Sequence, residues 1–224
     1  MRGSVIKQLV RKDWLLHLPL ILPCIGVGLV ALLILQIGGE VAGVLGSVWF
    51  FIAMIITASM LPMSAIVNER KKQTLAFVMS LPVSSIQHTA AKLISTIFIF
   101  FVPWLILVAG AVIMIEVRHV LPHGVIPIAL ILAMLPWIGL SLITAFALVG
   151  ETEGWAIAGT VICNSSYGFV WYFLSRFSSV MGDVKSPVVV WSPVALMILG
   201  GEFLTILLLL GVTFYLQSRK RDFV

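Results

Sequence analysis

The feature that most constrains this chain is the recurrence of long apolar runs. Six windows of about 20 or more mostly apolar residues follow one another along its 224 residues. A membrane-spanning helix needs about 20 such residues, because the hydrocarbon core is about 30 Å thick and a helix rises about 1.5 Å per residue. We therefore predict an all-α integral membrane protein made of a single transmembrane domain. The expected spans are about 18–37, 47–67, 93–115, 125–149, 155–175 and 194–217.

The composition supports a bilayer as the solvent. Hydrophobic residues make up 61% of the chain and charged residues 10%, whereas soluble domains carry about 25% charged residues. A water-soluble globule of this size does not have enough interior to bury so much apolar surface. The composition therefore excludes an ordinary soluble domain.

Lysine and arginine residues mark one side of the expected membrane. Most of them fall in the N-terminal segment, the second connection and the C-terminal tail, which alternate onto the same side. They are Arg2, Lys7, Arg11, Lys12, Arg70, Lys71, Lys72, Lys92, Arg219, Lys220 and Arg221. By the positive-inside rule, both termini and the insert 67–85 are cytoplasmic in a multi-pass protein of the cell membrane. The net charge of +5 then reflects topology and anionic lipid, not nucleic acid.

The N-terminal segment "SVIKQLVRKDWLLH" has the pattern of an interfacial helix. Val5, Ile6, Leu9 and Val10 share one helical face, the basic residues lie mostly on the other, and Trp14 falls at headgroup level. We expect this helix to lead into the first span at an angle. The alternative is a plain extension of that span.

Motifs for chemistry are scarce. The chain has no G-x-x-x-x-G-K-[ST] phosphate loop and no H-E-x-x-H zinc motif. "GLSLI", at Gly139–Ile143, lacks the second glycine of a nucleophile elbow. Pro122 separates His119 from His123, which disfavours a helical metal pair. Cys24 and Cys163 both fall inside spans, where free, packed thiols are expected. We predict neither a catalytic site nor a metal or cofactor in this chain.

Proline and acidic residues near or within the spans leave alternatives open. Pro103 and Pro136 fall near the middle of two spans, and the kinks they cause shape either a cavity or the packing. Glu202 lies about 10 Å deep in the last span, where an unpaired acid is costly and is a candidate for a substrate path. A boundary shifted inward would instead place it among headgroups. A proton-driven carrier usually needs several buried ionisable groups, and here Glu202 is nearly alone.

The cytoplasmic insert is the most polar stretch of the chain. In "ERKKQTLAFVMS", Leu75, Val78 and Met79 cluster on one helical face. Pro82 then forces a turn, and Ser84 or Ser85 can begin a return helix into the third span. The predicted result is a short helix, a bend and a return helix, an ordered elbow that a simple connection between two spans would not need.

The residues of this insert carry a resemblance. "NERKKQTLAFVMSLPVSSIQHTAAKLI" closely resembles the segment after the second span in type-2 ABC transporter permeases, the membrane subunits of a class of ABC exporters. The chain length, the six expected spans, the cytoplasmic ends and the interfacial helix also match that family. A large extracellular domain found in some relatives is missing.

The resemblance implies a function and a set of partners. In such transporters a coupling helix in this insert docks on a separate ABC-type ATPase, with two permeases, identical or homologous, and two ATPases per complex. ATP and Mg²⁺ would then be bound by the partner, with no cofactor in this chain. By position the coupling residues are Glu69, Arg70, Thr74, Leu75, Phe77, Leu81 and Pro82. Glu151 and Glu153 fall in a second, smaller cytoplasmic contact, although favourable charge at a helix N-terminus also explains them.

The resemblance also implies movement of an amphipathic or hydrophobic substrate, such as a peptide, lipid or drug, outward along a path lined by the second and fifth spans. Three rival classes remain. A membrane-embedded enzyme would need converging nucleophiles or carboxylates that the sequence does not supply. An ATP-independent channel or secondary carrier would work without an ATPase. A non-transporting scaffold would bind an ATPase without moving a substrate.

Overall fold

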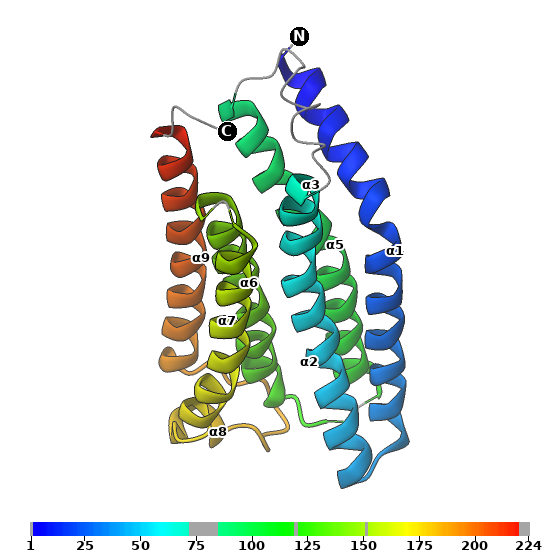
Figure 1. Ribbon diagram of the computed structural model, residues 1–224. Coiled ribbons are helices and arrows are strands. Elements are labelled where there is room, and N and C mark those ends of the chain that lie inside the picture. The colour runs from blue at the N-terminus through cyan, green and yellow to red at the C-terminus, as the bar shows by residue number, and fades with distance from the viewer. Residues whose placement is uncertain (1, 72–84, 119–120, 151, 220–224) are drawn as a thin grey trace.

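The computed structural model describes residues 2–71, 85–118, 121–150 and 152–219. Within these ranges the chain is helical and has no strand. Its helices, labelled in Figure 1, run antiparallel along one bundle, with short segments at its ends. They are α1 (Arg2–Ile37), α2 (Glu40–Pro62), the π-helical turn η1 (Met63–Val67), α3 (Asn68–Lys71), α5 (Ser85–Arg118), α6 (Val125–Val149), α7 (Glu153–Leu174), α8 (Ser178–Met181) and α9 (Pro193–Arg219).

A helix lies over each of the six apolar windows, and five are long and apolar enough to cross a membrane. These five are α1, α2 continued by η1, α5, α6 and α9. Helix α7 is long enough but not among them, because the polar run from Asn164 to Tyr167 interrupts its apolar sequence. The protein is therefore a membrane-embedded bundle with five candidate spans.

The N-terminal segment does not form a separate helix. Residues 2–17 are the first turns of α1, which continues without a break to Ile37. Figure 1 shows the first part of α1 at an angle to the rest of that helix, leaning over the end of the bundle. Pro19 and Pro23 lie inside α1, and proline bends a helix because it removes a backbone hydrogen bond and crowds the preceding turn. The expected change of direction is thus made within one helix.

Helices α1 and α2 form a tight hairpin. Gly38 and Gly39 turn the chain with φ angles of +78° and +89°, a region that glycine enters without steric cost. At Gly46 the two helices come close: a Cβ atom there would lie 2.6 Å from Leu35 Cγ and 2.9 Å from the Ala31 carbonyl oxygen. The absence of a side chain at this position sets how closely α2 approaches α1.

Helix α6 is the central helix of the other half of the bundle. It packs against α2, α7 and α9, and more than half of its residues are buried. Next to the mid-helix prolines, Trp104 of α5 meets Trp137 of α6 edge to face with ring centres 5.8 Å apart. The Trp104 indole N–H also donates to the Ala133 carbonyl oxygen at 2.7 Å. Beside Pro103 and Pro136, aromatic side chains therefore pack α5 against α6.

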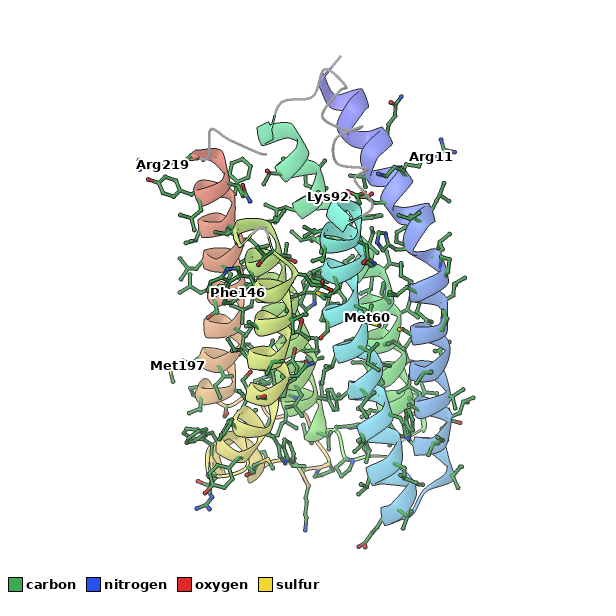
Figure 2. All side chains as sticks on the ribbon, in the orientation of Figure 1. Arg11, Met60, Lys92, Phe146, Met197 and Arg219 are labelled. Carbon is green, nitrogen blue, oxygen red and sulfur yellow. The ribbon has the colours of Figure 1, made fainter. Side chains whose placement is uncertain are left out.

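The start of α1, the end of α9 and the base of the insert lie at the same end of the bundle (Figure 1). Figure 1 shows the start of α1, the end of α3, the start of α5 and the end of α9 together there. The return helix predicted to begin near Ser85 is confirmed, since α5 runs from Ser85 to Arg118 without interruption. In Figure 2, Lys92 lies inside the bundle near this end, whereas Arg11 points away from it.

Candidate functional site

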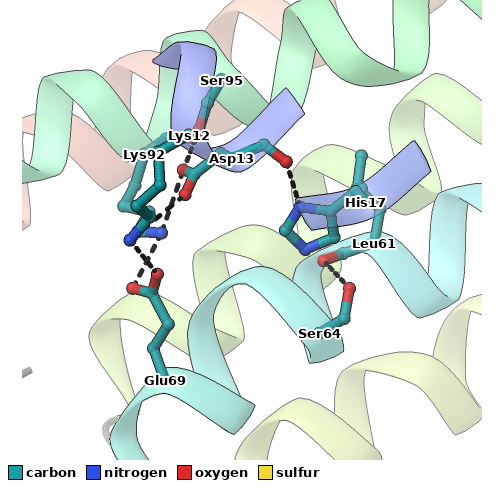
Figure 3. A network of polar contacts seen from close by, with 8 residues as sticks. All are labelled: Lys12, Asp13, His17, Leu61, Ser64, Glu69, Lys92 and Ser95. Carbon is teal, nitrogen blue, oxygen red and sulfur yellow. Dashed lines mark hydrogen bonds and ion pairs between the residues drawn. The ribbon is translucent and has the colours of Figure 1, made fainter. Parts of the chain in front are cut away.

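Four charged side chains from three helices meet where the insert joins the bundle (Figure 3). Lys12 and Asp13 come from α1, Glu69 from α3 and Lys92 from α5. Glu69 stands just before residues 72–84, and Lys92 stands in the second turn of the helix that follows them. We call these four residues the base network.

Lys92 is the centre of the base network. Its ammonium Nζ donates to Asp13 Oδ2 at 3.0 Å and lies 2.8 Å from Glu69 Oε2. Lys92 is 5% exposed, Asp13 2% and Glu69 8%. One buried lysine therefore joins α1, α3 and α5 through two carboxylates.

Lys12, the fourth member of the base network, and Ser95, a hydroxyl beside it, make its remaining contacts. Lys12, which is about half exposed, donates to Glu69 Oε1 at 3.0 Å. The hydroxyl of Ser95, one turn after Lys92, donates to Asp13 Oδ2 at 2.9 Å. Every charged group of the network has an opposite charge beside it, which a buried ion needs in order to offset the cost of leaving water.

The π-helical turn η1 helps to place Glu69. A π-helical turn holds more residues than an α-helical turn, so the residues that follow it are rotated about the axis relative to a regular helix. Pro62 precedes η1 and cannot donate the backbone hydrogen bond of a regular helix. One extra residue corresponds to a rotation of about 100°. The turn thus sets the direction in which the Glu69 side chain points from α3.

The two ammonium groups determine the charge state of Glu69. Burial by itself would raise the pKa of the Glu69 carboxyl group, but Lys92 and Lys12 outweigh burial and hold its pKa below the ordinary value of 4.5. Glu69 is therefore ionised at neutral pH. With two cations and two carboxylates, the base network is electrically neutral as a unit.

His17 lies one turn after Asp13 on α1 and extends the same group of polar contacts (Figure 3). Its ring nitrogen Nδ1 is 2.6 Å from the Asp13 carbonyl oxygen, so that Nδ1–H donates to it. His17 is 3% exposed, and its Nε2 has no hydrogen-bond partner among the described residues. It fixes the backbone of α1 next to Asp13.

The residues predicted to couple to an ATPase fall in three groups. Glu69 is in the base network. Arg70 lies in α3, and the structure does not describe its side chain. The other predicted residues lie outside the described ranges: Thr74, Leu75, Phe77, Leu81, Pro82 and Glu151. Glu153 begins α7 and is exposed. The structure therefore describes the base of the predicted coupling segment and not its tip.

Glu202 lies elsewhere, within α9. It is 7% exposed and shares the buried face of that helix with Ala195 and Ile206. Ala195 packs against residues of the first half of α6, and Ile206 packs beside Trp137 and Leu140. Glu202 thus faces α6, and its Oε2 has no hydrogen-bond partner among the described residues. It does not contact the base network in any described interaction.

The remaining candidates for chemistry do not form a centre. His123 Nδ1 is 2.9 Å from the Pro187 carbonyl oxygen, and its Nε2 is 3.9 Å from a Glu116 carboxylate oxygen. His119 lies outside the described residues. Ser141 is buried and donates to the Trp137 carbonyl oxygen. Cys24 and Cys163 are free thiols, as expected. No group of three potential metal ligands occurs within the part of the chain that the structure describes.

The importance of Lys12, Asp13, Lys92 and Ser95 was missed at the level of the sequence. In the sequence, Lys12 and Lys92 indicate only the orientation of the chain in the membrane. The available signal was Asp13, an acid in a basic segment directly before an apolar run, together with a lysine at the start of another span. Asp13 and Lys92 are both charged residues at the edge of the membrane's hydrocarbon core, where an unpaired charge is costly. An ion pair between them is therefore a reasonable expectation.

No family model matches this chain, and neither a curated protein nor a solved structure matches it. Its function is therefore inferred from its own residues and contacts and from the resemblance of the insert.

Proposed function

We propose that this chain is the membrane permease subunit of an ATP-driven ABC exporter. In this proposal two copies, or one copy and a homologous chain, cross the cell membrane and pair with two ABC-type ATPase subunits. The ATPases bind ATP and Mg²⁺, and the permease provides the path for an amphipathic or hydrophobic substrate such as a peptide, lipid or drug.

The observation that carries the proposal is the base network. Glu69 and Lys92, which stand on either side of residues 72–84, are ion-paired with each other and tied to α1 through Asp13 and Lys12. A flexible connection between two spans needs no such anchoring. An insert that receives force from a soluble partner does, because a firmly held base passes that force to the helices instead of absorbing it.

The insert and one short connection would provide the ATPase contacts. In our proposal Arg70, Thr74, Leu75, Phe77, Leu81 and Pro82 dock on the ATPase, while Glu69 holds their base. Glu151, between α6 and α7, and Glu153, the first residue of α7, make a second and smaller contact. The basic residues near this end of the bundle make it the cytoplasmic end under the positive-inside rule.

The substrate path would run beside α2 and α7, the second and fifth helices of the bundle by family resemblance. We propose that α7 crosses the membrane as a sixth span, since it lies along α6, which is a candidate span. Closure of the ATPases would push the insert, shift α1 and α5 through the base network, and open the path outward. Glu202 on α9 is the candidate for a polar group near that path.

Inside-out membrane vesicles test the proposal directly. Vesicles from host cells that produce the chain should accumulate a hydrophobic fluorescent probe when ATP is added, because outward transport becomes inward in such vesicles. The double variant Leu81→Asp, Pro82→Gly should abolish this accumulation. Val188→Asp, which adds the same charge at an exposed position of the opposite end, is the matched control and should transport normally.

Other outcomes would favour the rivals. Hydrolysis of ATP without movement of any peptide, lipid or dye probe would indicate a scaffold. Probe movement without ATP, driven by a proton gradient and lost in Glu202→Gln, would indicate a secondary carrier. The buried acid on α9 is the one observation that favours this second candidate. Transport unchanged in Glu202→Gln would remove that residue from the proposed path.

A further inference from the structure

Glu202 is a carboxyl group without a described partner inside the membrane-embedded bundle. Its side chain is buried, and its Oε2 accepts no hydrogen bond from the described residues. Helix α6, which it faces, contains no lysine, arginine or histidine, and Arg219 at the far end is the only such residue of α9. Because an unpaired charge within a membrane is costly, the carboxyl group needs a positive partner that these two helices do not supply.

The register of α9 against α6 places Glu202 beside a proline. Gln217 donates to the Leu148 carbonyl oxygen of α6, and both helices run toward the same end of the bundle (Figure 1). Counting back the same number of residues along both helices from this contact brings Glu202 about level with Ala133. Glu202 therefore faces the turn of α6 that leads to Pro136.

Pro136 frees a backbone carbonyl group in that turn. Proline has no N–H, so the carbonyl oxygen of Leu132, four residues earlier, loses its regular helical donor. The Trp104 indole N–H donates to the next carbonyl oxygen, that of Ala133, and no described side chain donates to Leu132. Leu132 packs against the same cluster as Ala195 of α9. The freed acceptor thus lies on the side of α6 that meets α9.

Thr205 adds a third oxygen at the edge of this contact. Its hydroxyl donates its one proton to the Gly201 carbonyl oxygen at 2.8 Å, so only the lone pairs of Oγ1 remain for another group. At 3.6 residues per turn, Gly201 and Thr205 lie on the same side of Glu202. Both are exposed, and no heavy atom lies within 4 Å of a Cβ atom built at Gly201. This side of Glu202 is therefore open to lipid.

We infer that Glu202, the Leu132 carbonyl oxygen and Thr205 form a binding site for the ammonium group of a cationic amphipathic substrate. We call these three groups the α9 acceptor site. Each accepts hydrogen bonds and none offers a free donor, so the site fits a ligand group that carries donors only. A primary ammonium group has three N–H donors and a positive charge, and it forms a neutral pair with a carboxylate. Its apolar chain can stay in the lipid beside Gly201.

Other positive partners fit the α9 acceptor site less well. A proton on Glu202 would supply one donor and leave the other two oxygens as they are. Ca²⁺ and Mg²⁺ take about six or more oxygen ligands, which three groups do not provide. An ammonium group satisfies all three acceptors at once and brings its own apolar surface for the lipid side.

The α9 acceptor site deepens the proposed function, on which its role in transport rests, because it gives the exported substrate a cationic group. Binding of an amine needs neither ATP nor an ATPase. Binding at Glu202 without ATP-driven transport would therefore refute the proposed function alone. ATP-driven transport of cationic and neutral probes alike, unchanged in Glu202→Gln, would refute this inference alone.

Binding of dansylcadaverine to the full-length chain in a nonionic detergent is the test. This probe joins a primary ammonium group to an apolar fluorophore, and its N-acetylated form is the neutral control. Fluorescence anisotropy should show that the amine binds at least about tenfold more tightly than the acetylated form, because hydrogen bonds to charged groups are the stronger ones. Equal affinity of the two forms would overturn the inference. So would displacement of the amine by Na⁺ at constant ionic strength, which would indicate a site for inorganic cations.

Two variants assign the binding to the α9 acceptor site. Glu202→Gln should remove the preference for the amine, whereas Glu40→Gln, which removes an exposed acid at the start of α2, should keep it. Thr205→Val, at an exposed position of nearly unchanged shape, should weaken binding of the amine about fivefold, the effect of one hydrogen bond. A preference that survives Glu202→Gln would overturn the inference. So would unchanged affinity in Thr205→Val, a result that stays informative even where Glu202→Gln does not fold.

Discussion

The ammonium group of Lys92 lies 2.8 Å from the carboxylate of Glu69, although residues 70–91 separate the two in the sequence. The contact closes the insert into a loop with a fixed base. Because Lys92 also binds Asp13 of α1, the position of the insert is linked to the longest helix of the bundle. This link fits the proposed function, in which force on the insert reaches the membrane helices.

Removing Lys92 should destabilise the protein far more than removing Lys12. In Lys92→Met two buried carboxylates lose their shared cation, and breaking a buried ion pair from one side costs about 3–5 kcal/mol. Lys12 is about half exposed, so Lys12→Met should cost about 1 kcal/mol or less. Thermal unfolding in mild detergent measures both. Similar losses in the two variants would contradict the central role of Lys92.

The contribution of Glu69 should depend on pH in one direction. Its pKa is held below the ordinary value of 4.5, so its ion pairs stabilise the folded state above about pH 4.5. That stabilisation is lost as the pH falls through the lower, folded-state pKa. The melting temperature of the wild type should therefore exceed that of Glu69→Gln at neutral pH.

The same comparison across pH provides the control for Glu69. The difference in melting temperature should stay constant from about pH 7 to about pH 5 and shrink below about pH 4.5. A difference that grew on acidification would mean that Glu69 is held in its protonated form, contrary to its pairing with Lys92 and Lys12.

Gly46→Ala should loosen the α1–α2 hairpin. The new methyl group would meet the Leu35 side chain and the Ala31 carbonyl oxygen, and overpacking of this kind costs about 1–3 kcal/mol. Gly43→Ala, one turn earlier on α2, would meet nothing within 4 Å and is the control. We expect a lower melting temperature for Gly46→Ala alone. Equal stability of the two variants would refute the close approach at Gly46.

Trp104→Phe tests the contact between α5 and α6. The substitution removes the indole N–H that donates to the Ala133 carbonyl oxygen, at an expected cost of about 1 kcal/mol. Trp49→Phe, at a half-exposed position on α2, should leave thermal stability nearly unchanged. A larger loss from Trp49→Phe would show that the aromatic packing beside Pro103 and Pro136 is not a main stabilising contact.

The helices could be predicted from the sequence because each is specified locally. An apolar run of about 20 residues forms a helix in lipid whatever its neighbours are, since its backbone must satisfy its own hydrogen bonds. For α6 the predicted and observed bounds agree, 125–149. The N-terminal segment was harder, because an amphipathic pattern is compatible with both an interfacial helix and the tilted start of α1.

The base network could not be predicted because it depends on rotation and packing. Whether Glu69 meets Lys92 depends on the π-helical turn before it, and no short-range pattern announces that turn. Asp13 and Lys92 come from helices distant in the sequence, and their contact requires α1 to lie beside α5. The predicted tip of the insert, including Leu81 and Pro82, lies outside the described residues and stays a prediction.

The most direct test of the account is to ask what binds the insert. The tagged chain would be purified from membranes of its native host in mild detergent, and the proteins that accompany it would be identified by mass spectrometry. We predict a separate ATPase with a phosphate-binding loop beside the wild type and beside Val188→Asp, but not beside the double variant Leu81→Asp, Pro82→Gly. Absence of any ATPase from the wild type, or equal recovery with the double variant, would contradict the proposal that this chain is driven through its cytoplasmic insert.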